Sequence, residues 1–127
     1  MTQNIISRIL LVDDEPEIRE IYSEALTQAG FAVVTAANGE QGVELAKKER
    51  PDLILMDIKM PILSGMDAAM KLKEDPDTRD IKIVFLTAFG DPAKDMAVAK
   101  AYGAADFIKK GIGLDELATK VRTHLLG

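Results

Sequence analysis

Three aspartates come directly after apolar segments of this chain and could form one acidic site. Asp13 and Asp14 follow residues 9–12, and Asp57 follows residues 53–56. Both segments are apolar at every position, which is typical of strands buried on both faces of a parallel sheet between helices. Because ligands bind beyond the carboxyl ends of such strands, we expect the three carboxylates to face one crevice.

Clustered carboxylates repel one another unless they are protonated or share a cation. A hard divalent ion is the simpler solution at neutral pH. Mg²⁺ accepts one or two carboxylates and keeps waters that phosphate oxygens can replace. We therefore expect Asp13, Asp14 and Asp57 to bind Mg²⁺, for which Mn²⁺ could substitute.

Two further residues fit a site that handles phosphate. Thr87 ends a fourth apolar segment, and Lys110 follows a fifth one. Their hydroxyl and ammonium groups can meet phosphate oxygens, and phosphoryl transfer depends mainly on positioning and charge neutralisation. The nucleophile would be Asp57, which would form an acyl phosphate.

The elements that must position these residues alternate strand and helix five times. Strands are predicted at Arg8–Val12 and at residues 31–36, 53–56, 83–87 and 105–109. Helices are predicted at residues 16–29, 39–50, 66–73 and 92–102 and from residue 114. Asn38 and Asp91 are expected to cap two of them. Five such units in 127 residues predict one α/β domain over residues 1–127, with a doubly wound parallel sheet.

Composition limits the classes of function. With 47% apolar residues the chain can bury one core, and its net charge of −5 disfavours direct binding to nucleic acid. The absence of cysteine excludes disulfides and thiolate metal sites. The first residues contain no signal peptide or membrane-spanning run, so we expect a cytoplasmic protein that does not bind membranes.

Taken in order, these residues resemble the CheY-like receiver domain of bacterial response regulators, the signalling proteins of two-component systems. The shared motifs are Asp13-Asp14, residues 57–61 with Gly65, Thr87-Ala88 and residues 107–110. The resemblance spans nearly the whole chain and implies a flavodoxin-like sheet with strand order 2-1-3-4-5. It also implies a switch that takes phosphate from a histidine kinase or a histidine phosphotransfer protein and then regulates a protein target.

The resemblance assigns roles to the residues of the acidic site. Asp57 would be the phosphoacceptor and a metal ligand. Asp14 would bind the metal directly, Asp13 mainly through water, and Lys59 through its backbone carbonyl. Lys110 would pair first with Asp57 and then with the phosphoryl group.

Other residues would carry the signal away from the site. Thr87 would bind the phosphoryl group, and Phe107 would change rotamer when Thr87 moves. The lysine of the family usually lies three residues after this aromatic, which selects Lys110 and leaves its neighbour Lys109 as a contact for partners. The target would meet Lys109, residues 93–102 (Tyr102 being the last), and the final helix.

The chain departs from the family pattern at three positions. Gly111 stands where the family typically has proline, often with a cis peptide bond. A non-proline cis bond costs about 2.5–4 kcal/mol, so we expect a trans bond and a more mobile loop. Phe107 replaces the common tyrosine, which predicts a bias toward the buried rotamer. Lys59 could pair with the phosphoryl group and prolong the phosphorylated state.

Two alternative functions stay open at this stage. A haloacid-dehalogenase-type phosphatase uses similar residues, but usually has a second aspartate where this chain has Lys59. A degenerate receiver would act as a phosphorylation-independent interaction module, a possibility that Gly111 keeps open. We expect a switch and not a turnover enzyme.

Gly111 and Gly113 do not form a dinucleotide loop, because Glu116 occupies the third glycine position. We also expect His124 to have a surface or helix-dipole role.

Overall fold

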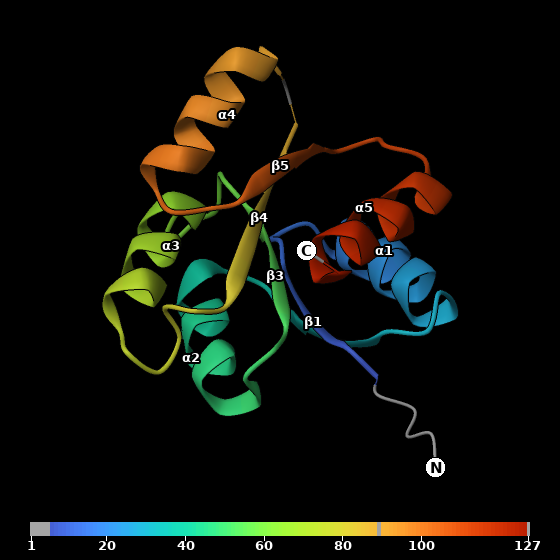
Figure 1. Ribbon diagram of the computed structural model, residues 1–127, viewed down its shortest axis with the longest axis horizontal. Helices are drawn as coiled ribbons and strands as arrows, with labels where there is room; N and C mark the ends of the chain where they lie inside the picture. The colour runs from blue at the N-terminus through green and yellow to red at the C-terminus, as the bar shows by residue number, and fades with distance from the viewer. Residues whose placement is uncertain (1–5, 89, 127) are drawn as a thin grey trace.

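A five-stranded parallel sheet with helices on both faces forms the structure, a computed structural model that describes residues 6–88 and 90–126 (Figure 1). The strands are β1 (Arg8–Val12), β2 (Ala32–Ala36), β3 (Leu53–Asp57), β4 (Lys82–Thr87) and β5 (Asp106–Lys109). The helices are α1 (Pro16–Gln28), α2 (Gly39–Glu49), α3 (Gly65–Glu74), α4 (Pro92–Ala101) and α5 (Leu114–Leu126). The strand order β2-β1-β3-β4-β5 confirms the predicted flavodoxin-like fold.

Side-chain alternation along the strands divides the core into two layers. On one face, residues such as Leu11, Leu55 and Leu86 pack against α1 and α5. On the other face, residues such as Met56 and Phe85 pack against α2, α3 and α4. Figure 1 shows the same division of the helices. Both faces of each inner strand are covered by helices, which explains why the strand segments are apolar at every position.

Predicted and observed boundaries agree to within about one residue for most elements, and β2 shows why they can differ. The strand was expected to begin at Phe31, but it begins at Ala32. The Phe31 side chain is buried as expected, whereas its backbone N–H donates to the carbonyl of Leu26 at the end of α1. The backbone of Phe31 therefore completes a helix terminus instead of joining the sheet.

Two predicted helix caps are present, and the only histidine makes a contact that the sequence did not indicate. Asn38 accepts a hydrogen bond from the Gln41 backbone, and Asp91 accepts one from the Ala93 backbone. His124, expected to have a surface or helix-dipole role, lies in the last turn of α5 and is half-buried, with Nε2 2.9 Å from Oδ2 of Asp106. This contact joins the end of α5 to the start of β5. Within residues 6–88 and 90–126, no helix is long and apolar enough to cross a membrane.

The connection between β3 and α3 contains a strained residue. Ile62 has a φ of 71°, a left-handed conformation that β-branched residues rarely adopt, and its side chain is 75% exposed. We predict that Ile62→Asn raises the free energy of unfolding by about 1 kcal/mol, because asparagine tolerates this conformation and little apolar burial is lost. Urea titration measures the change. Ile62→Val, which keeps the branched side chain, should leave stability nearly unchanged, and an equal gain in both variants would contradict the assignment of strain.

Candidate functional site

The three aspartates meet at the carboxyl edge of the sheet. One oxygen from each of Asp13, Asp14 and Asp57 lies within 4.8 Å of the others. Asp13 follows β1 and is fully buried, and Asp57 is the last residue of β3 and is 5% exposed. The neighbouring parallel strands end at this edge, so sheet geometry alone brings the carboxylates together.

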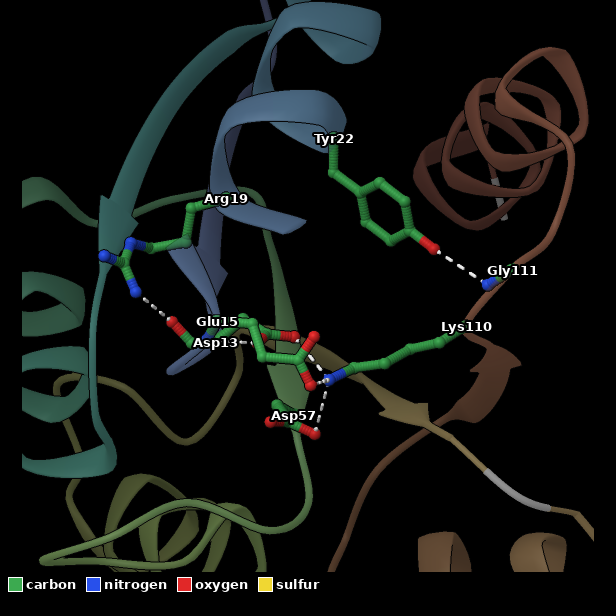
Figure 2. Close-up of polar contacts among 7 residues, drawn as sticks. All are labelled: Asp13, Glu15, Arg19, Tyr22, Asp57, Lys110 and Gly111. Atoms are coloured by element: carbon green, nitrogen blue, oxygen red, sulfur yellow. Dashed lines mark hydrogen bonds and ion pairs between the residues drawn. The ribbon is translucent and has the colours of Figure 1, made fainter. Parts of the chain in front are cut away.

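Lys110 is the cation of this cluster (Figure 2). Its Nζ lies 2.8 Å from Oδ2 of Asp13, 3.2 Å from Oδ1 of Asp57 and 3.5 Å from Oε1 of Glu15. The Lys110 side chain is only 9% exposed. Sequence spacing had favoured Lys110 over Lys109, and the structure places Lys110 in the cluster while Lys109 is exposed.

The backbone around Asp13 is held by several contacts. Its N–H donates to the Ala36 carbonyl, and its own carbonyl accepts a hydrogen bond of 2.7 Å from Nη1 of Arg19. The Glu15 N–H donates to Oδ1 of Asp13 at 2.9 Å. One carboxylate oxygen is therefore used to fix the loop, and the other faces Lys110.

Gly65 of the predicted motif has a steric role at the site. Its N–H donates to the Ile58 carbonyl, and a Cβ at this position would collide with the carbonyl oxygen of Asp57. The start of α3 therefore packs directly on the backbone of β3. A side chain larger than hydrogen at position 65 would displace either Asp57 or α3.

Burial and charge shift the pKa values within the cluster. Desolvation and the neighbouring charge of Asp13 raise the pKa of Asp57 to about 7, although Lys110 acts in the opposite direction. Burial alone would lower the pKa of Lys110, but its bonds to Asp13 and the charges of Asp57 and Asp13 outweigh burial and raise it. Lys110 is therefore cationic, while Asp57 holds its proton more tightly than an ordinary carboxyl group.

A cavity of about 330 Å³ opens beside Asp57 on the side of α3 and α4. Its lining includes Lys59, Thr87 and Asp95 together with apolar residues of β4 and both helices. Thr87 is the last residue of β4, as predicted, and it is buried. In α4, Oδ2 of Asp95 is buried and accepts no hydrogen bond from the described residues.

The other predicted switch and partner residues, Phe107, Lys109 and Tyr102, lie on β5 and at the end of α4. Phe107 is half-buried, packs against the core layer under α4, and borders a groove that Lys109 and residues of α4 and α5 also line. Tyr102 ends α4, where it is half-buried against the same layer. The preference of Phe107 for an inward rotamer stays a prediction.

In the connection from β5 to α5, the peptide bond before Gly111 is trans, as expected. No cis peptide bond occurs among the described residues, so the Lys110–Gly111 bond is trans, and Gly111 has a φ of 91°. The mobility of this loop stays a prediction. The Gly111 N–H donates a hydrogen bond to the hydroxyl of Tyr22 at 3.2 Å.

Sequence reasoning missed four residues near the site: Glu15, Arg19, Tyr22 and Asp95. Glu15 had one usable signal, since it directly follows the aspartate pair. Arg19 contacts the backbone of Asp13 at the preceding loop, and Tyr22 contacts Gly111 across the fold. The helical spacing of Tyr22 indicated only a buried position. Asp95 lies on a helix with little amphipathic pattern, so its orientation could not be inferred.

Comparisons with known proteins agree with this geometry. A family model described as the response regulator receiver domain matches residues 9–122. The chain is 36% identical over 122 residues to Protein PilH of Pseudomonas aeruginosa, covering 96% of this chain and 100% of that protein. It is 37% identical over 118 residues to a probable transcriptional regulator, ycf27, of Guillardia theta, covering 93% of this chain and 45% of that protein. The chain thus spans about half the length of the first curated relatives it matches.

A solved structure is similar over nearly the whole chain. It is the receiver domain of the sensor histidine kinase PA1611 from Pseudomonas aeruginosa, described with a magnesium ion coordinated in the active site cleft. The TM-score is 0.87 at 28% identity, and the match covers 97% of this chain and 100% of that one.

The raised pKa of Asp57 predicts an unusual dependence of stability on pH. Its ordinary value is 3.8 and its folded value is about 7, so the folded state binds a proton that the unfolded state releases between these limits. Stability should therefore fall as pH rises through this window. Without divalent metal at pH 8, Asp57→Asn should raise the free energy of unfolding by about 1–3 kcal/mol, and the gain should shrink toward pH 4.

Urea titrations in chelator at several pH values measure this difference. The exposed Asp77→Asn change serves as a control and should not reproduce the pH-dependent gain. If Asp57→Asn were less stable than the wild type at pH 8 in chelator, ionised Asp57 would stabilise the fold and the prediction would be contradicted.

Proposed function

The chain belongs to the response regulator receiver domain family, and we propose that it is a phosphorylation-dependent switch of a two-component system, with Asp57 as phosphoacceptor. The observation that best supports this role is the position of Lys110 Nζ, 3.2 Å from Asp57 Oδ1 and 2.8 Å from Asp13 Oδ2. A buried cation held beside a carboxylate nucleophile can stabilise the charge of an incoming phosphoryl group.

We further propose that Mg²⁺, or Mn²⁺ in its place, binds to this site. The ligands would be the carboxylates of Asp13, Asp14 and Asp57 and the backbone carbonyl of Lys59. The crowding of three carboxylates within 4.8 Å supports a divalent cation there, and the PA1611 receiver domain is described with magnesium in its cleft. When bound, such an ion neutralises charge on the carboxylates and the phosphoryl oxygens.

The proposed reaction is transfer of a phosphoryl group from a phosphohistidine. The phosphodonor is a histidine kinase or a histidine phosphotransfer protein. An ionised oxygen of Asp57 attacks the phosphorus, so that an O–P bond forms while the N–P bond breaks and its electrons stay on the imidazole nitrogen. Lys110 and Thr87 hold the phosphoryl oxygens. The product is an acyl phosphate whose slow hydrolysis resets the switch, so the protein is not a turnover enzyme.

The proposed output is a change in the face formed by α4, β5 and α5. A phosphoryl group that binds Thr87 would draw this residue inward and open space for Phe107, which is half-buried beside the groove lined by Lys109. An unidentified target protein would contact Lys109, Tyr102 and the two helices. The net charge of −5 favours a protein target over direct contact with nucleic acid. We place the switch in the cytoplasm, together with its phosphodonor.

The central prediction is that Asp57 becomes phosphorylated. Incubation with acetyl phosphate and Mg²⁺ should add the mass of one phosphoryl group to the wild type, as measured by intact-protein mass spectrometry. The gain should be absent in Asp57→Asn and in chelator. It should persist in Asp67→Asn, which changes an exposed carboxylate in the first turn of α3. No gain in the wild type would favour the degenerate receiver that signals without phosphate.

We predict that the Lys59 side chain prolongs the lifetime of the phosphorylated state. Its side chain is exposed and lines the cavity beside Asp57, from which it can pair with phosphoryl oxygens. Loss of such a pair in Lys59→Ala should speed dephosphorylation by about 2- to 5-fold. Loss of phosphorylated mass after donor removal gives the rate, with Lys71→Ala on α3 as the control. An unchanged or slower rate in Lys59→Ala would reject the role.

A further inference from the structure

The backbone at the connection from β5 to α5 carries the lysine whose head group lies between Asp13 and Asp57. The Lys110 N–H donates to the Thr87 carbonyl at 2.7 Å, which fixes the residue on its strand side. The next residue, Gly111, has a φ of 91°. No atom lies within 4 Å of a Cβ built there, so backbone conformation and not space requires glycine.

Glycine by itself leaves this connection free to rotate, and the structure shows what restrains it. The Gly111 N–H donates to the Tyr22 hydroxyl at 3.2 Å (Figure 2). Tyr22 lies on α1, is 3% exposed, and packs in the core layer beside α5. Its ring is therefore fixed by packing, and its hydroxyl is a fixed acceptor. A proline at position 111 could not make this bond, because it has no N–H.

The bond joins the same two segments that the Lys110 side chain joins. Tyr22 belongs to the helix that directly follows Asp13 and Glu15, and these residues lie 2.8 and 3.5 Å from Lys110 Nζ. The β5–α5 connection is thus tied to the segment around α1 twice, through the backbone of Gly111 and through the head group of Lys110. Figure 2 shows both links from one side.

We infer that Tyr22 is a positioning residue for phosphoryl transfer: its hydroxyl holds the Gly111 backbone so that Lys110 Nζ stays between Asp13 and Asp57. This inference rests on the proposed function for its kinetic consequence, but the contact itself does not. Tyr22→Phe keeps the buried ring and removes only the acceptor. The Gly111 N–H then loses its partner in the fold and is left to solvent, and Lys110 occupies its position beside the aspartates for a smaller fraction of the time.

The kinetic test measures the rate of phosphorylation by acetyl phosphate at saturating Mg²⁺. Tyr22→Phe should lower the rate by about 3- to 10-fold, the range expected for loss of one partly buried hydrogen bond. Ser23→Ala is the matched control, because it removes a hydroxyl from the next residue of α1 that bonds only within the helix. In a Lys110→Ala background, Tyr22→Phe should have almost no further effect. Equal reductions in both backgrounds would overturn the inference, since they indicate a general structural role.

A second test does not depend on phosphorylation. By NMR, the Gly111 amide should exchange with solvent at least about tenfold faster in Tyr22→Phe, while amides of β3 stay unchanged. The ¹⁵Nζ resonance of Lys110 should shift toward that of an exposed lysine. Unchanged exchange and an unchanged Lys110 resonance would overturn the inference. If the wild type never accepts phosphate, the proposed function fails, and these two NMR measurements still decide whether Tyr22 positions Lys110.

Discussion

Charge balance at the carboxyl edge of the sheet is the constraint on which the site depends. Asp13 and Asp57 are buried beside each other, and Lys110 lies between them with little exposure of its own. Carboxylates buried side by side repel each other unless a cation lies between them, and a buried lysine without carboxylates would also be costly. Burial and the charge of Asp13 raise the pKa of Asp57 even though Lys110 opposes them. Three carboxylates meet a single lysine at this edge, and the excess of negative charge suits the divalent cation proposed for the site.

The two layers of the core give the two sides of this site different properties. On the α1 and α5 side, Lys110, Glu15, Arg19 and Tyr22 form a network of ion pairs and hydrogen bonds that joins loops to helices. On the α3 and α4 side, Asp57 borders a cavity, and α4 buries only Ala99 completely. A rigid side can hold the reacting groups, while a loosely packed side can change shape. This asymmetry agrees with a switch in which α4 and β5 carry the response.

The sequence predicted the fold and most of the cluster for reasons that can be traced to single residues. Uninterrupted apolar segments required a sheet covered on both faces, and polar residues at their ends, such as Asp57 and Thr87, had to lie at one edge. What it could not predict depends on contacts between distant elements. The periodicity of α1 placed Tyr22 in the core without indicating that its hydroxyl would meet Gly111, 89 positions away. The apolar residues of α4 follow no clear helical periodicity, so the sequence did not indicate which way Asp95 points. The contact between His124 and Asp106 depends on how α5 packs beside β5, which the sequence did not indicate either.

The close approach of Gly65 to the Asp57 carbonyl limits how this domain can be re-engineered. Because the first residue of α3 rests on the last residue of β3, the path of residues 58–64 has a fixed span. A deletion that shortens this stretch would have to lift the helix off the strand and would distort the reacting carboxylate with it. The contact between these two residues should therefore be kept as a unit when chimaeras are built.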